Sequence, residues 1–237
     1  MTENVKRILC VIPARAGSKG VPDKNIRLIN EKPLLAYTIE SAIASNCFDT
    51  VMVSTESEKI STIAKKYGAE IPFYRHTDLA QDDTSSDEVI IDVLKKLENL
   101  NQTYDVVVLR DCTVPFIDEN DIKSALKLFL ENDCDGVFCS IRAHPNPYFG
   151  MMEPNKDGFL EPSKVYSSKI TRRQNAPVVY DVDGMFILNV KHFLNSKRIS
   201  SGKILPFVIS KEHGHMIDFE FDFKVAELLI KNKLQSH

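Results

Sequence analysis

The chain has 237 residues, 43% of them hydrophobic and 27% charged, and this composition fits one globular domain spanning residues 1–237. Its 30 Lys and Arg against 33 Asp and Glu leave a net charge of -3, so no overall basic field favours a nucleic-acid partner. The five cysteines form no Cys-x-x-Cys pair, which argues against a disulfide framework and favours a cytoplasmic location. No apolar run approaches about 18 residues, so no membrane partner is expected.

Short apolar runs recur along the chain and predict strands. They cover residues 8–12, 51–53, 106–109, 136–139, 185–190 and 204–209. Several are rich in Val and Ile without polar alternation, which is typical of strands covered on both faces.

Amphipathic helical stripes lie between these runs. Residues 60–67 have helical spacing, and Thr55 with Glu58 predicts a capping box at the start of that helix. Similar stripes follow Ser85 and Asp118. Strand and helix therefore alternate, which predicts an α/β fold with a doubly wound, mostly parallel sheet. Ligands in such folds bind beyond the carboxyl ends of the strands.

Residues 142–183 break this rhythm. The segment contains five prolines and no helical stripe, so we expect it to leave the sheet as an excursion within the same domain.

The loop after the first strand reads IPARAGSKG. Gly17 and Gly20 allow backbone amides to approach an anion, and Arg15, Lys19 and Lys24 concentrate three cations. This pattern favours a polyphosphate ligand; the alternative is a solvated basic loop. The dinucleotide and P-loop fingerprints are both absent.

This loop resembles the signature of the cytidylyltransferases that activate acidic sugars, above all the CMP-N-acylneuraminate synthetases, which reads IPAR-x-x-SKG followed by KN. The resemblance implies a Rossmann-like nucleotidyltransferase whose loop holds the triphosphate of CTP. It covers Arg15, Ser18, Lys19, Gly20, Lys24 and Asn25.

A second stretch, RHTDLAQD followed by three hydroxyl residues, resembles the family's R-x-x-x-L-A-x-D motif. The resemblance implies a cytidine pocket lined by Arg75, Thr84, Ser85 and Ser86. Arg75 can donate to a base carbonyl, and Ser85 or Ser86 to ribose or phosphate oxygens. Alternatively, Ser85 is only a helix N-cap.

A third stretch, LRDCTVP, is similar to the family's L-x-Q-P-T-S-P-L-R, which lies near the sugar. Thr113 matches, whereas Asp111 stands in place of Gln and Ile117 in place of the final Arg. Asp111 can approach a sugar hydroxyl, an amide or the metal; its alternative role is in a strand-end turn.

The stretch DFEFDF near the C-terminus alternates with a period of two, which predicts a strand with Asp218 and Glu220 on one face. Two such carboxylates can hold one Mg²⁺. The stretch resembles the family's metal-binding I-D-x-D motif, with Glu220 in place of the second Asp. Asp222 is predicted as the N-cap of the following helix.

Residues 172–174 and 177–184 resemble the family's R-Q stretch and the x-x-N-G turn, with Asp183 replacing Asn. The resemblance implies that Arg173 binds the sugar's carboxylate and that Tyr180 walls the sugar pocket. It also implies that the excursion is a dimerisation arm, and hence a homodimer.

The resemblance as a whole implies a Mg²⁺-dependent transfer of CMP from CTP to an acidic nine-carbon sugar, with release of pyrophosphate. The departures from the family pattern at Asp111, Phe149 and Asp183 favour a legionaminate-type sugar over N-acetylneuraminate; around Phe149 the chain lacks a basic residue that sialate enzymes often place near the sugar. Two alternatives stay open: a nucleotidyltransferase for another acidic sugar such as the eight-carbon Kdo, or a non-catalytic nucleotide-binding module.

Overall fold

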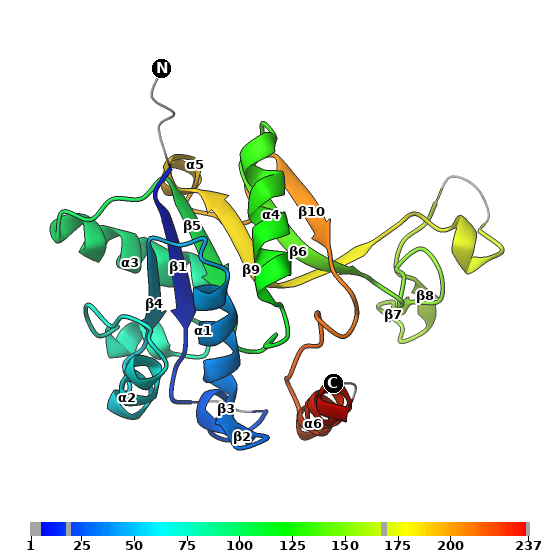
Figure 1. Cartoon of the computed structure of the whole chain (residues 1–237). Coiled ribbons are helices and arrows are strands. Elements are labelled where there is room, and N and C mark those ends of the chain that lie inside the picture. The colour runs from blue at the N-terminus through cyan, green and yellow to red at the C-terminus, as the bar shows by residue number, and fades with distance from the viewer. Residues whose placement is uncertain (1–5, 18–19, 167–169, 236–237) are drawn as a thin grey trace.

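The computed structural model describes residues 6–17, 20–166 and 170–235, and its centre is a six-stranded sheet with the order β10-β6-β9-β5-β1-β4 (Figure 1). The strands are β1 (Ile8–Pro13), β4 (Thr50–Ser54), β5 (Val106–Arg110), β6 (Gly136–Arg142), β9 (Tyr180–Asn189) and β10 (Ile204–Val208). The β1–β4, β1–β5 and β6–β10 pairs are parallel, and β9 runs antiparallel between β5 and β6. The predicted strands and the mostly parallel sheet are confirmed.

Helices cover both faces of the sheet. They are α1 (Leu34–Ala44), α2 (Glu58–Lys66), α3 (Ser86–Asn99), α4 (Glu119–Glu131), α5 (Val190–Ser196) and α6 (Glu220–Gln235). On β1, Cys10 and Ile12 pack with α1 and α2, whereas Leu9 and Val11 pack with α3 and α5. Burial on both faces explains why the strand sequence has no polar alternation. None of the described helices combines the length and apolar character that a membrane crossing requires.

The excursion predicted over residues 142–183 leaves the sheet as an arm (Figure 1). Strands β6 and β9 continue beyond the sheet as a ribbon that pairs Arg142 with Tyr180. The antiparallel pair β7 (Met152–Pro154) and β8 (Leu160–Pro162) lies in the arm, as does the short helix η3 (Arg173–Asn175).

Three smaller elements lie beside the carboxyl ends of the strands. They are η1 (Lys24–Ile26), the β2 (Leu28–Ile29) and β3 (Lys32–Pro33) hairpin, and η2 (Thr77–Ala80). Helix α6 packs on this side through a cluster that joins it to β2 and the start of α1.

One predicted helix cap is confirmed and another is wrong. The capping box at the start of α3 forms between Ser85 and Glu88. Thr55 is not the N-cap of α2; Ser57 takes that position and accepts from the Ile60 N–H at 3.4 Å. The Thr55 hydroxyl instead accepts from the backbone N–H of Ser57, two residues further along the chain.

The strand predicted for the DFEFDF stretch is wrong, because α6 begins inside it. Phe223, Ala226 and Ile230 are buried with helical spacing, while Phe219 and Phe221 are 67% and 74% exposed. The phenylalanines therefore do not share a buried face. The helical period of the residues that follow outweighs the short alternating pattern.

Asp222 is also not the N-cap of α6. It lies in the first turn, where its Oδ2 accepts from the backbone N–H groups of Asp218 at 3.0 Å and Phe219 at 2.8 Å. The Asp222 carboxylate thus accepts hydrogen bonds from two backbone N–H groups directly before α6.

Candidate functional site

A cavity of about 260 Å³ opens beyond the carboxyl ends of β1 and β5. We call it the strand-end cavity. Its lining comes from four separate segments and includes Arg15, Lys24, Asn25, Arg75, Thr84, Ser86, Asp111 and Thr113. These are eight of the residues that the sequence predicts for the site, and they meet where the doubly wound fold places its ligands.

The loop after β1 is tied to η1 and to the segment before α6. Asn25 donates from its side-chain amide to the Arg15 carbonyl at 2.9 Å. A Cβ at Gly20 would lie 2.1 Å from the Asp218 carbonyl oxygen, so only glycine permits this approach. Ser18 and Lys19 lie outside the described residues.

Lys24 connects the two ends of the chain. Its Nζ donates to the Ile217 carbonyl at 2.7 Å and lies 3.3 Å from Asp218 Oδ1. The Lys24 side chain is only 12% exposed. The cationic loop and the C-terminal acidic stretch therefore share one site.

A chain of polar contacts links the first two motifs. Glu56 accepts from the Ala16 N–H at 2.7 Å and from Arg75 Nη2 at 3.1 Å. Arg15 forms an ion pair with Asp82 at 2.6 Å. Arg75 is 6% exposed, and burial lowers its pKa while Glu56 opposes that shift. The contact with Glu56 thus holds the Arg75 guanidinium in place where Arg75 lines the strand-end cavity.

The three hydroxyl residues of the second motif have different surroundings. Ser85 is the N-cap of α3, and its Oγ contacts Glu88 in the capping box. Thr84 and Ser86 line the strand-end cavity. Thr84 Oγ1 also donates to the Asp78 carbonyl. The geometry favours Thr84 and Ser86 over Ser85 as ligand contacts.

Asp111, which lines the strand-end cavity, is hydrogen-bonded to Asp183. Burial raises the pKa of Asp111 to about 7, and the charge and hydrogen bond of Asp183 add to the rise. Burial also raises the pKa of Asp183. The Asp111 N–H donates to the Gly184 carbonyl at 3.0 Å, which keeps the two segments in register. Burial and the charge of its neighbour therefore favour the protonated form of Asp111.

The two acids expected to hold a metal point to different cations. Asp218 pairs with Lys24 at the strand-end cavity, whereas Glu220 pairs with Arg27, whose guanidinium also lies over the Phe223 ring. The prediction that Asp218 and Glu220 share one strand face is therefore wrong. Asp183 and Asp218 interact electrostatically, which groups Asp218 with the buried pair instead.

Of the other residues expected near the sugar, Thr113 and Arg173 line different cavities. The carbonyl of Thr113, which lines the strand-end cavity, accepts from the Ile217 N–H at 2.8 Å. Arg173 contacts His144 and lines a separate cavity at the base of the arm. Tyr180 is 38% exposed at the start of β9.

Two charged residues near the site, one half-buried and one buried, are not predicted from the sequence. Glu56, in the segment directly after β4, has no motif to mark it, although that strand end is where ligands are expected. Arg110 ends β5 inside an apolar run and is fully buried, donating to the Ile117 carbonyl at 3.2 Å. Its charge offsets that of Asp111.

The chain has the α/β fold of solved nucleotidyltransferase structures. A solved structure of CMP:2-keto-3-deoxy-manno-octonic acid synthetase complexed with CTP matches with a TM-score of 0.69. The two chains are 14% identical, and the match covers 96% of this chain and 99% of that one. It establishes the fold.

Sequence comparison establishes the family. The cytidylyltransferase family model matches residues 9–234. Post-translational flagellin modification protein B of Campylobacter coli is 36% identical over 231 residues, which cover 97% of each chain. The CMP-N,N'-diacetyllegionaminic acid synthase of Campylobacter jejuni is also 36% identical over 231 residues, covering 95% of this chain and 96% of that one. The chain belongs to the cytidylyltransferase family and is an enzyme of the nucleotidyltransferase class.

Proposed function

We propose that this cytidylyltransferase transfers CMP from CTP to the anomeric hydroxyl of an acidic nine-carbon sugar of the sialate or legionaminate type, releasing pyrophosphate. The observation that carries the proposal is the convergence of Lys24 with Asp218 at the strand-end cavity. The names of the relatives support the acidic sugar, since one of them is a CMP-N,N'-diacetyllegionaminic acid synthase.

The triphosphate would bind at the loop after β1. Arg15 and Lys24 supply positive charge, and Gly20 lets the loop approach the Asp218 backbone, which brings the loop beside the C-terminal acidic stretch. Ser18 and Lys19 belong to the same proposed set on the strength of the motif. Opposite unit charges about 4 Å apart gain roughly 4 kcal/mol at an effective dielectric near 20, so phosphate contacts offset the crowding of cations.

The nucleoside would lie between η2 and the start of α3. Arg75 donates to the base, and Thr84 and Ser86 donate to ribose or phosphate oxygens. Arg75 keeps a buried Nε that has no partner among the described residues, which suits a donor awaiting a ligand carbonyl. Ser85 stabilises the start of α3, beside Thr84 and Ser86, as the N-cap of that helix.

Asp111, Asp183 and Asp218 fit a hard divalent cation, and we propose Mg²⁺. Asp183 interacts with Asp111 and with Asp218. Burial, with the added charge of Asp183, raises the pKa of Asp111 to about 7, and a divalent cation here would favour the ionised form. Asp218 with Asp111 would hold the ion. Glu220 is the alternative ligand that the sequence motif indicates. A bound Mg²⁺ would neutralise charge on the phosphate oxygens during transfer.

The chain's own residues would act by positioning and by electrostatic stabilisation. Lys24, little exposed and held by the Ile217 carbonyl, stabilises the negative charge of the departing pyrophosphate. Thr113 and Asp183 orient the sugar so that its hydroxyl attacks in line with the leaving group. No covalent intermediate is needed.

We further propose that the arm makes a homodimer in the cytoplasm. Its surface exposes large apolar side chains, among them Phe159 at 72% and Val165 at 87%. Exposed apolar area of this kind marks an interaction surface. Light scattering coupled to size-exclusion chromatography would give the mass of a dimer; a monomer at high micromolar concentration contradicts this part.

A panel of pyrophosphate-release assays tests the function. Each of the four nucleoside triphosphates is combined with N-acetylneuraminate, N,N'-diacetyllegionaminate and Kdo in the presence of Mg²⁺. We expect release only with CTP and a nine-carbon acid. Release with Kdo alone would favour the related eight-carbon reaction. No release in any combination would favour a non-catalytic nucleotide-binding module.

A further inference from the structure

A second cavity, of about 280 Å³, lies where the arm leaves the sheet. We call it the arm-side cavity. Its walls are the end of β6, the start of β9 and the loop of residues 209–216. Asp183 lines it, and Asp183 is hydrogen-bonded to Asp111 of the strand-end cavity. The two cavities therefore meet at this acid pair.

Two cationic side chains, Arg142 and Lys211, line the arm-side cavity. Neither forms an ion pair with any other residue that the structure describes. Both also line the neighbouring cavity that contains Arg173, whereas Arg173 does not line the cavity of Asp183. Arg142 and Lys211 are thus the arginine and lysine side chains that share the arm-side cavity with Asp183.

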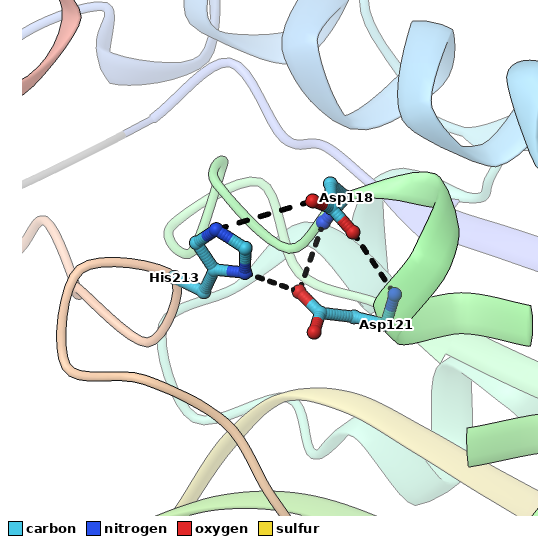
Figure 2. A group of neighbouring side chains, drawn as sticks. All are labelled: Asp118, Asp121 and His213. Carbon is cyan, nitrogen blue, oxygen red and sulfur yellow. Dashed lines mark hydrogen bonds and ion pairs between the residues drawn. The ribbon is translucent and has the colours of Figure 1, made fainter. Parts of the chain in front are cut away.

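Lys211 lies on a loop that is anchored before any ligand binds. His213, two residues further on, donates from Nδ1 to Asp121 at 2.6 Å, and its Nε2 lies 3.9 Å from Asp118 (Figure 2). These two acids also cap α4. A Cβ at Gly214 would lie 2.4 Å from Ile141, so the loop packs directly on β6. A preorganised loop loses little entropy when its lysine binds an anion.

The cluster of Asp118, Asp121 and His213 is not itself a ligand site. Its ligand atoms lie within 4.8 Å of one another, but Asp118 Oδ1 accepts from two backbone N–H groups and Asp121 Oδ2 accepts from the Asp118 N–H and from His213. Its atoms are used to fasten the loop to α4.

We propose that Arg142 and Lys211 hold the carboxylate of the acidic sugar, an inference that rests on the proposed function. In a 2-keto acid sugar the carboxylate is bonded to the carbon that carries the reacting hydroxyl. Its anchor must therefore lie beside the acid pair. The cations of the strand-end cavity are assigned to the nucleotide, so the anchor is expected in the cavity of Asp183. Arg142 and Lys211 meet this condition, and Arg173, in the neighbouring cavity, does not. Charge-assisted donors are the side chains that select a carboxylate over a neutral group.

The test compares a carboxylate with its neutral ester. The probes are N-acetylneuraminate and N,N'-diacetyllegionaminate, each with its C1 methyl ester, assayed with CTP and Mg²⁺. For Arg142→Gln and Lys211→Gln we expect kcat/KM for the acid to fall about 10- to 100-fold, with the ester and the KM for CTP little changed. Lys203→Gln, at an exposed ion pair with Asp133, is the matched control. Equal losses for acid and ester, or no loss, would overturn the proposal.

Binding separates this inference from the function on which it rests. If the wild-type enzyme releases no pyrophosphate with either acid, the proposed function fails, and calorimetric titration of the same acids still tests the anchor. We expect binding to the wild type that the Arg142→Gln/Lys211→Gln double variant loses. Equal affinities, or no binding to the wild type, overturn it.

Discussion

Lys24 Nζ lies 3.3 Å from Asp218 Oδ1, although 194 residues separate them in the chain. The contact joins the loop after β1 to the segment that precedes α6, and the close approach of Gly20 to the Asp218 backbone joins the same two segments a second time. A ligand that bridges both ends of the chain must lie here.

Lys24→Ala should lower kcat/KM about 100- to 1,000-fold, because the departing pyrophosphate loses a positioned cation. Steady-state pyrophosphate release measures the effect. Lys127→Ala serves as the control, since Lys127 is exposed and lies 3.8 Å from Glu131 on α4. Wild-type turnover in the Lys24 variant would show that this lysine does not touch the phosphates.

Asp218→Asn and Glu220→Gln separate the two candidate metal ligands. Glu220 is paired with Arg27, so its variant should keep a normal Mg²⁺ titration of activity. Asp218→Asn should reduce the rate at least about 100-fold and shift the Mg²⁺ midpoint to higher concentration. If Glu220→Gln shifts that midpoint as far as Asp218→Asn does, the pair that the motif predicts is right and our assignment is wrong.

The fold could be predicted because its signals are long and repeated. Apolar runs separated by helical stripes mark every strand of the central sheet. Because ligands bind beyond the carboxyl ends of such strands, the sequence predicts that Arg15, Arg75 and Asp111 lie close together, and all three line the strand-end cavity. The direction of β9 could not be predicted, since a buried strand has the same composition in either orientation.

The strand prediction for the DFEFDF stretch fails for a physical reason. Six alternating residues contain only three apolar positions, and their partners are set by tertiary packing. Phe223 is buried by the cluster that includes Val21 and Ile29, while Phe219 and Phe221 face solvent. The contact of Glu56 with Arg75 was hidden for the same reason, because it joins segments that no local pattern relates.

Asp111 should make stability depend on pH. Its pKa is raised to about 7, so the folded chain binds this proton more tightly than the unfolded chain does. The contribution of Asp111 is therefore fully present below its ordinary pKa and is lost as the pH rises through about 7. Without divalent cations, Asp111→Asn should have a higher Tm than the wild type at pH 8.

That difference in Tm should shrink as the pH falls below the ordinary pKa of 3.8, where the wild-type carboxyl is mostly protonated in both states. Thermal unfolding followed by circular dichroism across this range measures it. A constant difference at all pH values would mean that Asp111 has an ordinary pKa.

The two serines at the start of α3 should behave differently. Ser85→Ala removes the cap and should lower the free energy of unfolding by about 1 kcal/mol, with the KM for CTP unchanged. Ser86→Ala should raise the KM for CTP about 2- to 10-fold with little change in stability. The opposite pattern would place Ser85, and not Ser86, against the nucleotide.

Diffraction from crystals grown with CTP and Mn²⁺ tests the convergence of the two ends of the chain most directly, because Mn²⁺ replaces Mg²⁺ and scatters anomalously. We expect the anomalous peak beside Asp218 and Asp111, the triphosphate against Lys24, and the base within reach of Arg75. A nucleotide bound away from Lys24, or a peak that touches neither aspartate, would contradict the account.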